Sequence, residues 1–168
     1  MKKFIVTGGA GFIGSNFINY LLDNDENSII NIDKLSYGSN LNNIEISSSR
    51  YKFMKKSIAD NLMDIIDDAD YIINFAAESH VDRSIANPDS FVKENINGVL
   101  NLLENIRKSK NDPVLINIGT DEEYGDIVNG SFSEDDMLKP SSPYSASKAS
   151  SSLLALSYFR TYGIKKQL

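Results

Sequence analysis

No cysteine occurs among the 168 residues, and there is a single histidine, His80. The absence of cysteine excludes a disulfide framework, a thiolate metal site and a cysteine nucleophile. One imidazole cannot build a histidine-rich metal site, so we expect no bound metal. We expect His80 to pack or to support other residues rather than to transfer protons.

Basic residues are also scarce, because 17 Lys and Arg stand against 23 Asp and Glu, giving a formal net charge of -6. Proteins that bind nucleic acid or anionic membranes usually present a basic face, so we expect neither partner. Long hydrophobic runs are lacking as well. The N-terminal apolar run ends at Val6, which is too short for a signal peptide or a membrane span and predicts a cytoplasmic protein.

What the sequence does contain is an alternation of strand-like and helix-like segments. Short apolar runs predict five strands, at residues 2–7, 28–33, 51–54, 70–77 and 113–120. Helical spacing of apolar residues predicts helices at 12–24, 61–69, 88–109 and 144–162. Strands separated by helices are parallel and joined by right-handed crossovers. The sequence therefore predicts one α/β domain over residues 1–168, a doubly wound (Rossmann) parallel sheet with helices on both faces and strand order 3-2-1-4-5.

A glycine-rich stretch, TGGAGFIGSN, joins the first strand to the first helix. Gly8 would permit a tight turn, Gly11 would let a phosphate approach the backbone, and Gly14 would let the helix pack closely on the strand. The amides of Phe12 and Ile13 would then face the anion from the helix N-terminus. A glycine-rich turn without a ligand is the alternative, and the glycines alone do not decide between them.

An acidic residue strengthens the first interpretation. Asp33 ends the second strand at the interval of about 20 residues at which a carboxylate binds the adenosine ribose of a dinucleotide. Strand, turn, helix and acid in this order predict dinucleotide binding. A carboxylate at this place repels a ribose 2′-phosphate, which favours NAD over NADP, although the neighbouring Lys34 works against that preference.

Two further groups of residues carry reactive side chains. Tyr144 and Lys148 are spaced to face the same side of a helix, where the ammonium would favour the phenolate of a tyrosine whose free pKa is near 10. The pair could accept a proton beside a hydride acceptor, although such pairs also occur by chance. Thr120, Asp121 and Glu122 follow the fifth strand, at the sheet edge where ligands bind. They are either a capping threonine with solvated acids or, in differing environments, an acid and a base.

Five segments together resemble a known family. TGGAGFIGSN, NIDKLSYGSN, NFAAESHVDRSI, GTDEEYGD and PSSPYSASKAS resemble, in order and spacing, the nucleotide-sugar branch of the extended short-chain dehydrogenase/reductases, and within it the dTDP-glucose 4,6-dehydratases. The resemblance covers essentially the whole chain. Thr-Asp-Glu before Tyr-Gly is the motif that separates the dehydratases from the epimerases and decarboxylases of this branch.

The resemblance implies an NAD-dependent lyase that acts on a nucleotide sugar. Tyr144 would take the proton of the sugar 4-hydroxyl while NAD takes the C4 hydride, and Thr120 would bind the C4 oxygen. Glu122 would remove the C5 proton and Asp121 would protonate the departing C6 hydroxyl, after which the hydride returns to C6.

The resemblance also implies the remaining contacts. Ser79 and Thr120 would bind the sugar, and helices 88–109 and 144–162 would form a homodimer. Besides the glycine-rich turn and Asp33, the cofactor would contact Lys34, Ser36, Ser57, Ile58, Phe75, Ala76, Ala77, Ser79, Tyr144 and Lys148.

Three positions depart from the family pattern. Ser57 stands where aspartate is usual, Glu94 where threonine is usual, and Glu123 where an apolar residue is usual. We expect the first two to weaken cofactor binding, and the third to perturb the neighbouring acids by like-charge repulsion.

Members of this family also continue beyond the point that corresponds to Leu168. We therefore expect the C-terminal substrate domain to be absent, the fifth strand to leave an open edge, and these residues alone to have little activity. A non-catalytic NAD-binding remnant or interaction module is one alternative, and a UDP-sugar 4-epimerase or decarboxylase is another.

Overall fold

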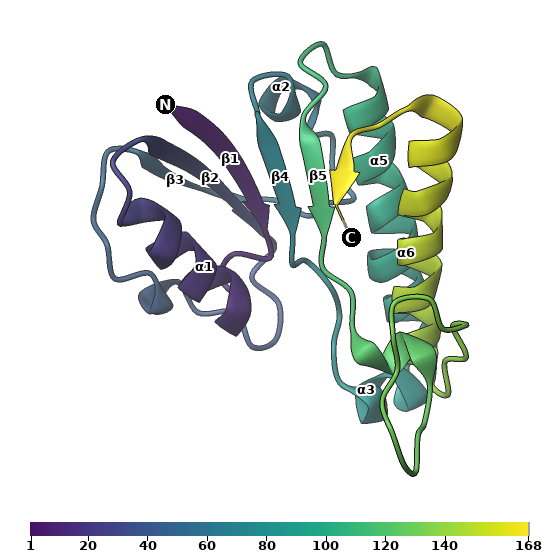
Figure 1. Ribbon diagram of the computed structural model, residues 1–168. Helices are drawn as coiled ribbons and strands as arrows, with labels where there is room; N and C mark the ends of the chain where they lie inside the picture. Colours follow the sequence, from purple (N-terminus) through teal and green to yellow (C-terminus); the bar gives the residue numbers. More distant parts are fainter. Residues whose placement is uncertain (168) are drawn as a thin grey trace.

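The computed structural model describes residues 1–167, and Leu168, the last residue of the predicted domain, lies outside the described residues. Its centre is a sheet of parallel strands in the order β3-β2-β1-β4-β5-β6 (Figure 1). This confirms the predicted parallel sheet and the order 3-2-1-4-5, and it adds a strand beside β5. The strands are β1 (Lys2–Thr7), β2 (Asn27–Asp33), β3 (Tyr51–Lys55), β4 (Tyr71–Asn74), β5 (Val114–Asn117) and β6 (Lys166–Gln167).

Helices cover both faces of the sheet, as expected for crossovers of one hand. α1 lies on one face, and α5 and α6 lie side by side on the other (Figure 1). The α-helices are α1 (Phe12–Leu22), α2 (Met63–Ile66), α3 (Val81–Ala86), α4 (Pro88–Phe91), α5 (Gly98–Lys108) and α6 (Pro143–Tyr162). The remaining helical turns are η1 (Leu41–Asn43), η2 (Val92–Asn97) and η3 (Asp121–Tyr124).

The core has two layers because strand side chains alternate between the faces. In β1, Val6 packs with Ile18 and Leu22 of α1. Its neighbour Ile5 belongs to the opposite layer, which contains Leu102 of α5. The two layers hold the sheet between its helices. Because the strands are parallel, their carboxyl ends meet along one edge of the sheet.

The expected open edge of β5 is corrected by the structure. Leu115 and Ile116 of β5 pair in parallel with Lys166 and Gln167 of β6. The chain leaves α6 at Gly163, which has a left-handed conformation with φ 70° and ends the helix as predicted. It then returns to the sheet within a few residues.

The single long helix expected over residues 88–109 is also interrupted. α4 and α5 are joined by η2, a π-helical segment. Asn87 occupies the cap position before Pro88, but its side chain makes no capping hydrogen bond. The short α3 was not predicted, because its few residues give no helical period.

Candidate active site

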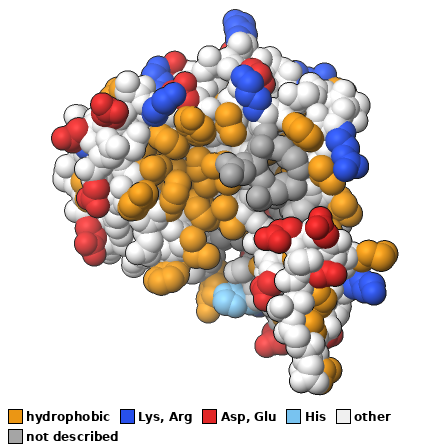
Figure 2. Space-filling view, in the orientation of Figure 1, with side chains coloured by type: hydrophobic (Ala, Val, Ile, Leu, Met, Phe, Trp, Pro, Cys, Tyr) orange, Lys and Arg blue, Asp and Glu red, His pale blue; other side chains and the backbone are white. Residues whose placement is uncertain are grey.

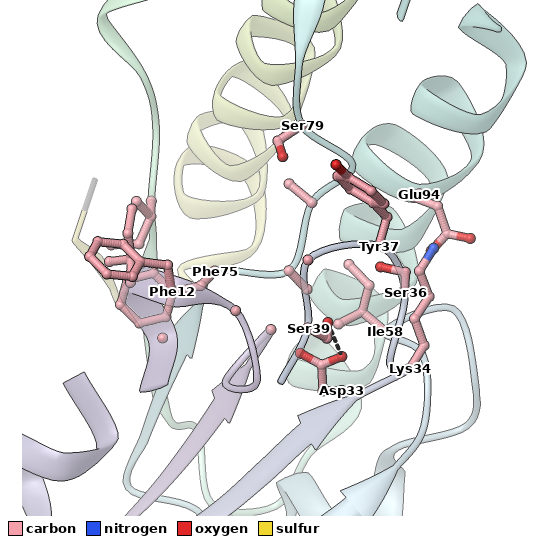
Figure 3. Close-up of a pocket in the computed structure, with 18 of the residues that line it drawn as sticks. Phe12, Asp33, Lys34, Ser36, Tyr37, Ser39, Ile58, Phe75, Ser79 and Glu94 are labelled. Atoms are coloured by element: carbon pink, nitrogen blue, oxygen red, sulfur yellow. Dashed lines mark hydrogen bonds and ion pairs between the residues drawn. The ribbon is translucent and has the colours of Figure 1, made fainter. Parts of the chain in front are cut away.

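One cavity of about 430 Å³ lies along the carboxyl ends of the strands (Figure 3). Every residue expected to contact the cofactor lines it. These are Gly8, Gly11, Phe12, Ile13, Gly14, Asp33, Lys34, Ser36, Ser57, Ile58, Phe75, Ala76, Ala77, Ser79, Tyr144 and Lys148. Thr120, Asp121 and Glu122 do not line this cavity. On the face of the molecule that Figure 2 shows, the sole histidine lies near acidic side chains.

The glycines of the turn after β1 differ in how much room the fold leaves for a side chain. Gly8 has φ +71°, and a Cβ there would come within 2.6 Å of the Ala76 nitrogen. A Cβ on Gly14 would lie 2.5 Å from the Gly8 carbonyl oxygen. A Cβ on Gly11 would meet only that same oxygen, at 3.3 Å. The fold therefore requires Gly8 and Gly14, whereas a Cβ on Gly11 would make one slightly tight contact with backbone.

Gly11 is also the N-cap of α1, and no side chain caps this helix. The first amides of a helix have no partner within it, and they carry partial positive charge. Phe12 and Ile13, the first two residues of α1, are exposed at the cavity. The N-terminus of α1 can therefore accept an anion that approaches over Gly11.

Asp33 is buried at the end of β2 and held by three donors. The Ala10 amide donates to Oδ2 at 3.0 Å, while the Leu35 amide and the Ser39 hydroxyl donate to Oδ1 at 2.7 and 3.1 Å (Figure 3). These bonds fix the carboxylate beside the glycine-rich turn. Oδ1 already accepts two hydrogen bonds, whereas Oδ2 keeps lone-pair capacity for one more donor, such as a ribose hydroxyl.

The Lys34 ammonium is shared between two carboxylates. Its Nζ lies 2.9 Å from Glu78 Oε1 and 3.1 Å from Glu94 Oε2. Burial alone would lower the pKa of Lys34, but the hydrogen bonds to Glu78 and Glu94 outweigh it, and the pKa is raised. Arg83 adds a further ion pair to Glu78 at 3.4 Å. The positive charge of Lys34 is thus balanced by carboxylates of the protein.

The π-helical segment η2 positions the loop that follows β4. Asn95 is buried and accepts a hydrogen bond from the Glu78 amide at 2.7 Å. Its own amide group donates to the Glu78 carbonyl and to the Ser147 hydroxyl of α6. This clamp joins the Phe75–Ser79 side of the cavity to the helix that carries Tyr144. π-Helical turns of this kind are frequent at functional sites.

Tyr144 and Lys148 both line the cavity, and the pKa of each is shifted. Burial raises the pKa of Tyr144, the Glu122 carboxylate raises it further, and Thr120 opposes them. The Lys148 ammonium donates instead to the Ile118 carbonyl, and burial lowers its pKa. The pKa of Tyr144 is thus raised and the hydrogen bond of Lys148 goes to backbone, so the stabilisation of the phenolate by Lys148 stays a prediction.

Asp121 and Glu122 begin the helical turn η3, and Thr120 caps it from an extended conformation, as one of the two alternatives from the sequence expects. Thr120 and Glu123 make a capping box, in which the Glu123 carboxylate accepts from the Thr120 amide at 3.1 Å. Asp121 is exposed and Glu122 is half-buried, so the two acids have different surroundings. Glu123 is buried and directed back into the turn, which gives this departure from the family pattern a structural role.

Sequence reasoning missed several lining residues, namely Ile32, Tyr37, Gly38, Ser39, Lys56, His80, Ile118 and Gly119. Most lie on loops without a distinguishing pattern. The capping box was visible in advance, since Thr120 and Glu123 have the Thr-x-x-Glu spacing. His80 is exposed at the cavity with φ +79°, which excludes a buried packing role, and its ring contacts the lining residue Tyr37 edge-on at 6.0 Å between centroids.

Comparison with known proteins places this site in a family. The family model described as GDP-mannose 4,6 dehydratase matches residues 5–167. The chain belongs to this family.

Individual relatives agree with that assignment. The chain is 46% identical to the low-salt glycan biosynthesis protein Agl12 of Haloferax volcanii, over 95% of its own length and 53% of the relative's. It is 44% identical to a dTDP-glucose 4,6-dehydratase of Streptomyces antibioticus, over 96% and 50%. Among solved structures, the dTDP-glucose 4,6-dehydratase DesIV of Streptomyces venezuelae, with NAD bound, superimposes with a TM-score of 0.87 at 38% identity, covering 98% of this chain and 53% of DesIV.

Epimerases share the same architecture at lower identity. The UDP-glucuronic acid 4-epimerase of Bacillus cereus superimposes with a TM-score of 0.90 at 31% identity, covering 98% of this chain and 54% of the epimerase. The chain thus spans about half the length of the relatives it matches. Among the described residues 1–167, no helix is long and apolar enough to cross a membrane.

Proposed function

We propose that this chain is the NAD-binding and catalytic part of a dTDP-glucose 4,6-dehydratase. The observation that carries the proposal is a single cavity that brings together the glycine-rich turn, Asp33 and the pair Tyr144 and Lys148. A nicotinamide dinucleotide requires an anion site, a ribose acceptor and a proton acceptor near the nicotinamide. The residues present fit each requirement.

The cofactor would be held along the strand ends. The pyrophosphate would lie over Gly11 at the N-terminus of α1, where no protein atom fills the place of a Cβ. Asp33 would accept from the adenosine ribose. NAD is favoured over NADP because Asp33 repels a 2′-phosphate and because Lys34 is already bound by Glu78 and Glu94.

The reaction would follow from four side chains. Bound NAD would supply both a hydride acceptor and a hydride donor, because the hydride would leave C4 and return to C6 after the elimination, so the cofactor would be unchanged by the whole reaction. Tyr144 would accept the proton of the sugar 4-hydroxyl, and Thr120 would hydrogen-bond the C4 oxygen. The 4-keto group then acidifies C5, so Glu122 would remove the C5 proton while Asp121 gives a proton to the C6 hydroxyl as it leaves as water. This division of roles between Glu122 and Asp121 rests on the resemblance to the dehydratases.

An epimerase is the second candidate, because the Bacillus cereus 4-epimerase superimposes on the chain as well as the dehydratases do. Epimerisation at C4 needs no elimination of the C6 hydroxyl. The two carboxylates Asp121 and Glu122, held in one capped turn beside Tyr144, favour the dehydratase.

We also propose that the chain forms a homodimer through α5 and α6. Leu100 of α5 and Leu153 of α6 are exposed on the outer surface of these paired helices. Apolar side chains at such positions gain stability when a second copy covers them.

A chimera tests the dehydratase proposal. Residues 1–167 would replace the matching half of the Streptomyces antibioticus dehydratase, whose remaining half would supply the nucleotide site. We expect the chimera to convert dTDP-glucose to a 4-keto-6-deoxy product with alkaline absorbance, and Tyr144→Phe to abolish that signal. The 168-residue chain alone should show little turnover, because binding energy from the remote nucleotide positions the sugar. A folded chimera that binds NAD but converts only UDP-sugars to their 4-epimers would contradict the proposal.

A further inference from the structure

Glu94 stands at one end of the cavity, away from the glycine-rich turn. In Figure 3, Phe12 lies on one side of the cavity, and Glu94 and Lys34 lie on the other. With the pyrophosphate at α1 and the ribose at Asp33, the base of a dinucleotide continues beyond Asp33 toward the end of β3. Ser57 and Ile58 follow β3 and line this same end.

The Glu94 carboxylate is used on only one of its oxygens. Oε2 accepts from the Lys34 ammonium at 3.1 Å and from the Ser57 hydroxyl at 3.4 Å. Within residues 1–167, Oε1 has no hydrogen-bond partner. Glu94 lines the cavity, its side chain is 17% exposed, and Oε1 is not a buried atom, so a ligand in the cavity can reach it. A carboxylate oxygen without a protein donor can accept a hydrogen bond from such a ligand.

A backbone donor directly follows Ser57, whose hydroxyl contacts the Glu94 carboxylate. The Ile58 amide has no hydrogen-bond partner within the described residues, while Ser57 and Ala59 on either side are bonded in the local turn. Ile58 itself is buried, and Gly98 of α5 packs so closely that a Cβ there would lie 2.9 Å from the Ile58 side chain. α5 therefore holds this segment in place.

We propose that Glu94 selects adenine at this end of the cavity by accepting a hydrogen bond from its exocyclic amine. The proposal rests on the proposed binding of NAD. Adenine presents the N6 amine as donor next to the N1 acceptor, which matches Glu94 and the Ile58 amide. Hypoxanthine presents a carbonyl and an N–H in the same places, so donor and acceptor are exchanged. Glu94 would then strengthen cofactor binding, against the expectation from its departure from the family pattern.

Lys34 does not remove Glu94 from this role. The Lys34 ammonium is held more closely by Glu78, at 2.9 Å, and both of its contacts leave Glu94 Oε1 unused. If Glu94 served only to anchor Lys34, its removal would weaken all dinucleotides alike. A selective effect on the base distinguishes the two roles.

The experiment compares NAD with nicotinamide hypoxanthine dinucleotide, which carries a carbonyl in place of the amine. Calorimetric titration of the 168-residue chain should show NAD binding about tenfold or more tightly, the scale of one well-paired base edge. Glu94→Leu should bring the ratio of the two dissociation constants toward one. Glu94→Gln, which keeps an acceptor oxygen, should retain part of the preference. Glu26→Leu, an equal charge change at an exposed residue before β2, should leave the ratio unchanged.

Each outcome decides the matter. Equal affinities in the unmodified chain, or an undiminished ratio in Glu94→Leu, would overturn the role of Glu94 while leaving the proposed NAD binding intact. Failure of the unmodified chain to bind either dinucleotide would overturn the proposed function and this inference with it. If Glu94→Leu does not fold, Glu94→Gln decides, because an undiminished ratio in that variant would overturn the role of Glu94.

Discussion

At the scale of single residues, the glycine-rich turn separates positions that the fold requires from one that a ligand requires. Gly14→Ala places a Cβ 2.5 Å from the Gly8 carbonyl oxygen, so backbone must move. We expect this variant to lose about 2–3 kcal/mol of stability in urea unfolding. Gly11→Ala should cost about 1 kcal/mol, because alanine is a poorer N-cap than glycine and its Cβ would lie 3.3 Å from the Gly8 carbonyl oxygen, and it should also weaken NAD binding in calorimetry. Equal destabilisation by both substitutions would contradict this division.

The phenol of Tyr144 gives a prediction about pH. Burial and the Glu122 carboxylate both disfavour the phenolate, so the pKa of Tyr144 lies above its ordinary value of 10. A tyrosine acting as proton acceptor must ionise, and we therefore expect activity of the chimera to rise as pH increases through the alkaline range. Glu122→Gln removes one repelling charge and should lower the pKa of Tyr144.

Ultraviolet titration of phenolate absorbance measures this shift directly, with the spectrum of Tyr144→Phe subtracted to isolate the one phenol. Glu134→Gln, in the exposed loop before α6, serves as the control of equal charge change. An unchanged midpoint in Glu122→Gln would show that the two side chains do not interact.

At the scale of elements, α5 and α6 are joined by a hydrogen bond from the Tyr158 hydroxyl to Glu104 at 2.8 Å. Burial raises the pKa of Tyr158 to about 12, and the hydrogen bond to Glu104 adds to the rise. Because the folded state favours the neutral phenol, its stabilisation is fully present below about pH 10, the unfolded pKa, and is lost as pH rises toward the folded value. Tyr158→Phe should cost about 1 kcal/mol in urea unfolding at neutral pH, and less at alkaline pH.

Tyr162→Phe is the matched control for this prediction. The Tyr162 ring packs on Tyr158 at 4.9 Å between centroids, and its hydroxyl makes no hydrogen bond within the described residues. This substitution should change stability little at any pH. Similar losses for both variants would assign the effect to the rings rather than to the bond with Glu104.

The elements also show what the sequence could predict. The strands, α1 and the end of α6 followed from apolar periodicity, from the glycine-rich turn and from Gly163, since these are local signals. The π-helical segment did not, because it depends on Asn95 turning inward to bond Glu78 and Ser147, and those partners are far away in the sequence. The hydrogen bond of the Lys148 ammonium could not be predicted either, because its acceptor, the Ile118 carbonyl just after β5, is 30 residues away in the sequence.

At the scale of the whole molecule, the exposed apolar residues of α5 and α6 predict self-association. We expect light scattering to report a dimer at high micromolar concentration. Leu153→Glu should shift the mass to that of the monomer, because it would place a charge in the middle of the paired helices. Glu26→Gln, at an exposed residue before β2, should not. A monomeric mass for the unmodified chain would contradict the proposed interface.

The central claim is that one cavity seats NAD beside Tyr144, and calorimetry with NAD and NADP tests it most directly. We predict one NAD site per chain, with NADP bound about tenfold or more weakly, because its 2′-phosphate would face the Asp33 carboxylate while Lys34 is held by Glu78 and Glu94. Asp33→Asn should reduce this preference. No binding of NAD, or binding of NADP that equals or exceeds it, would contradict the account.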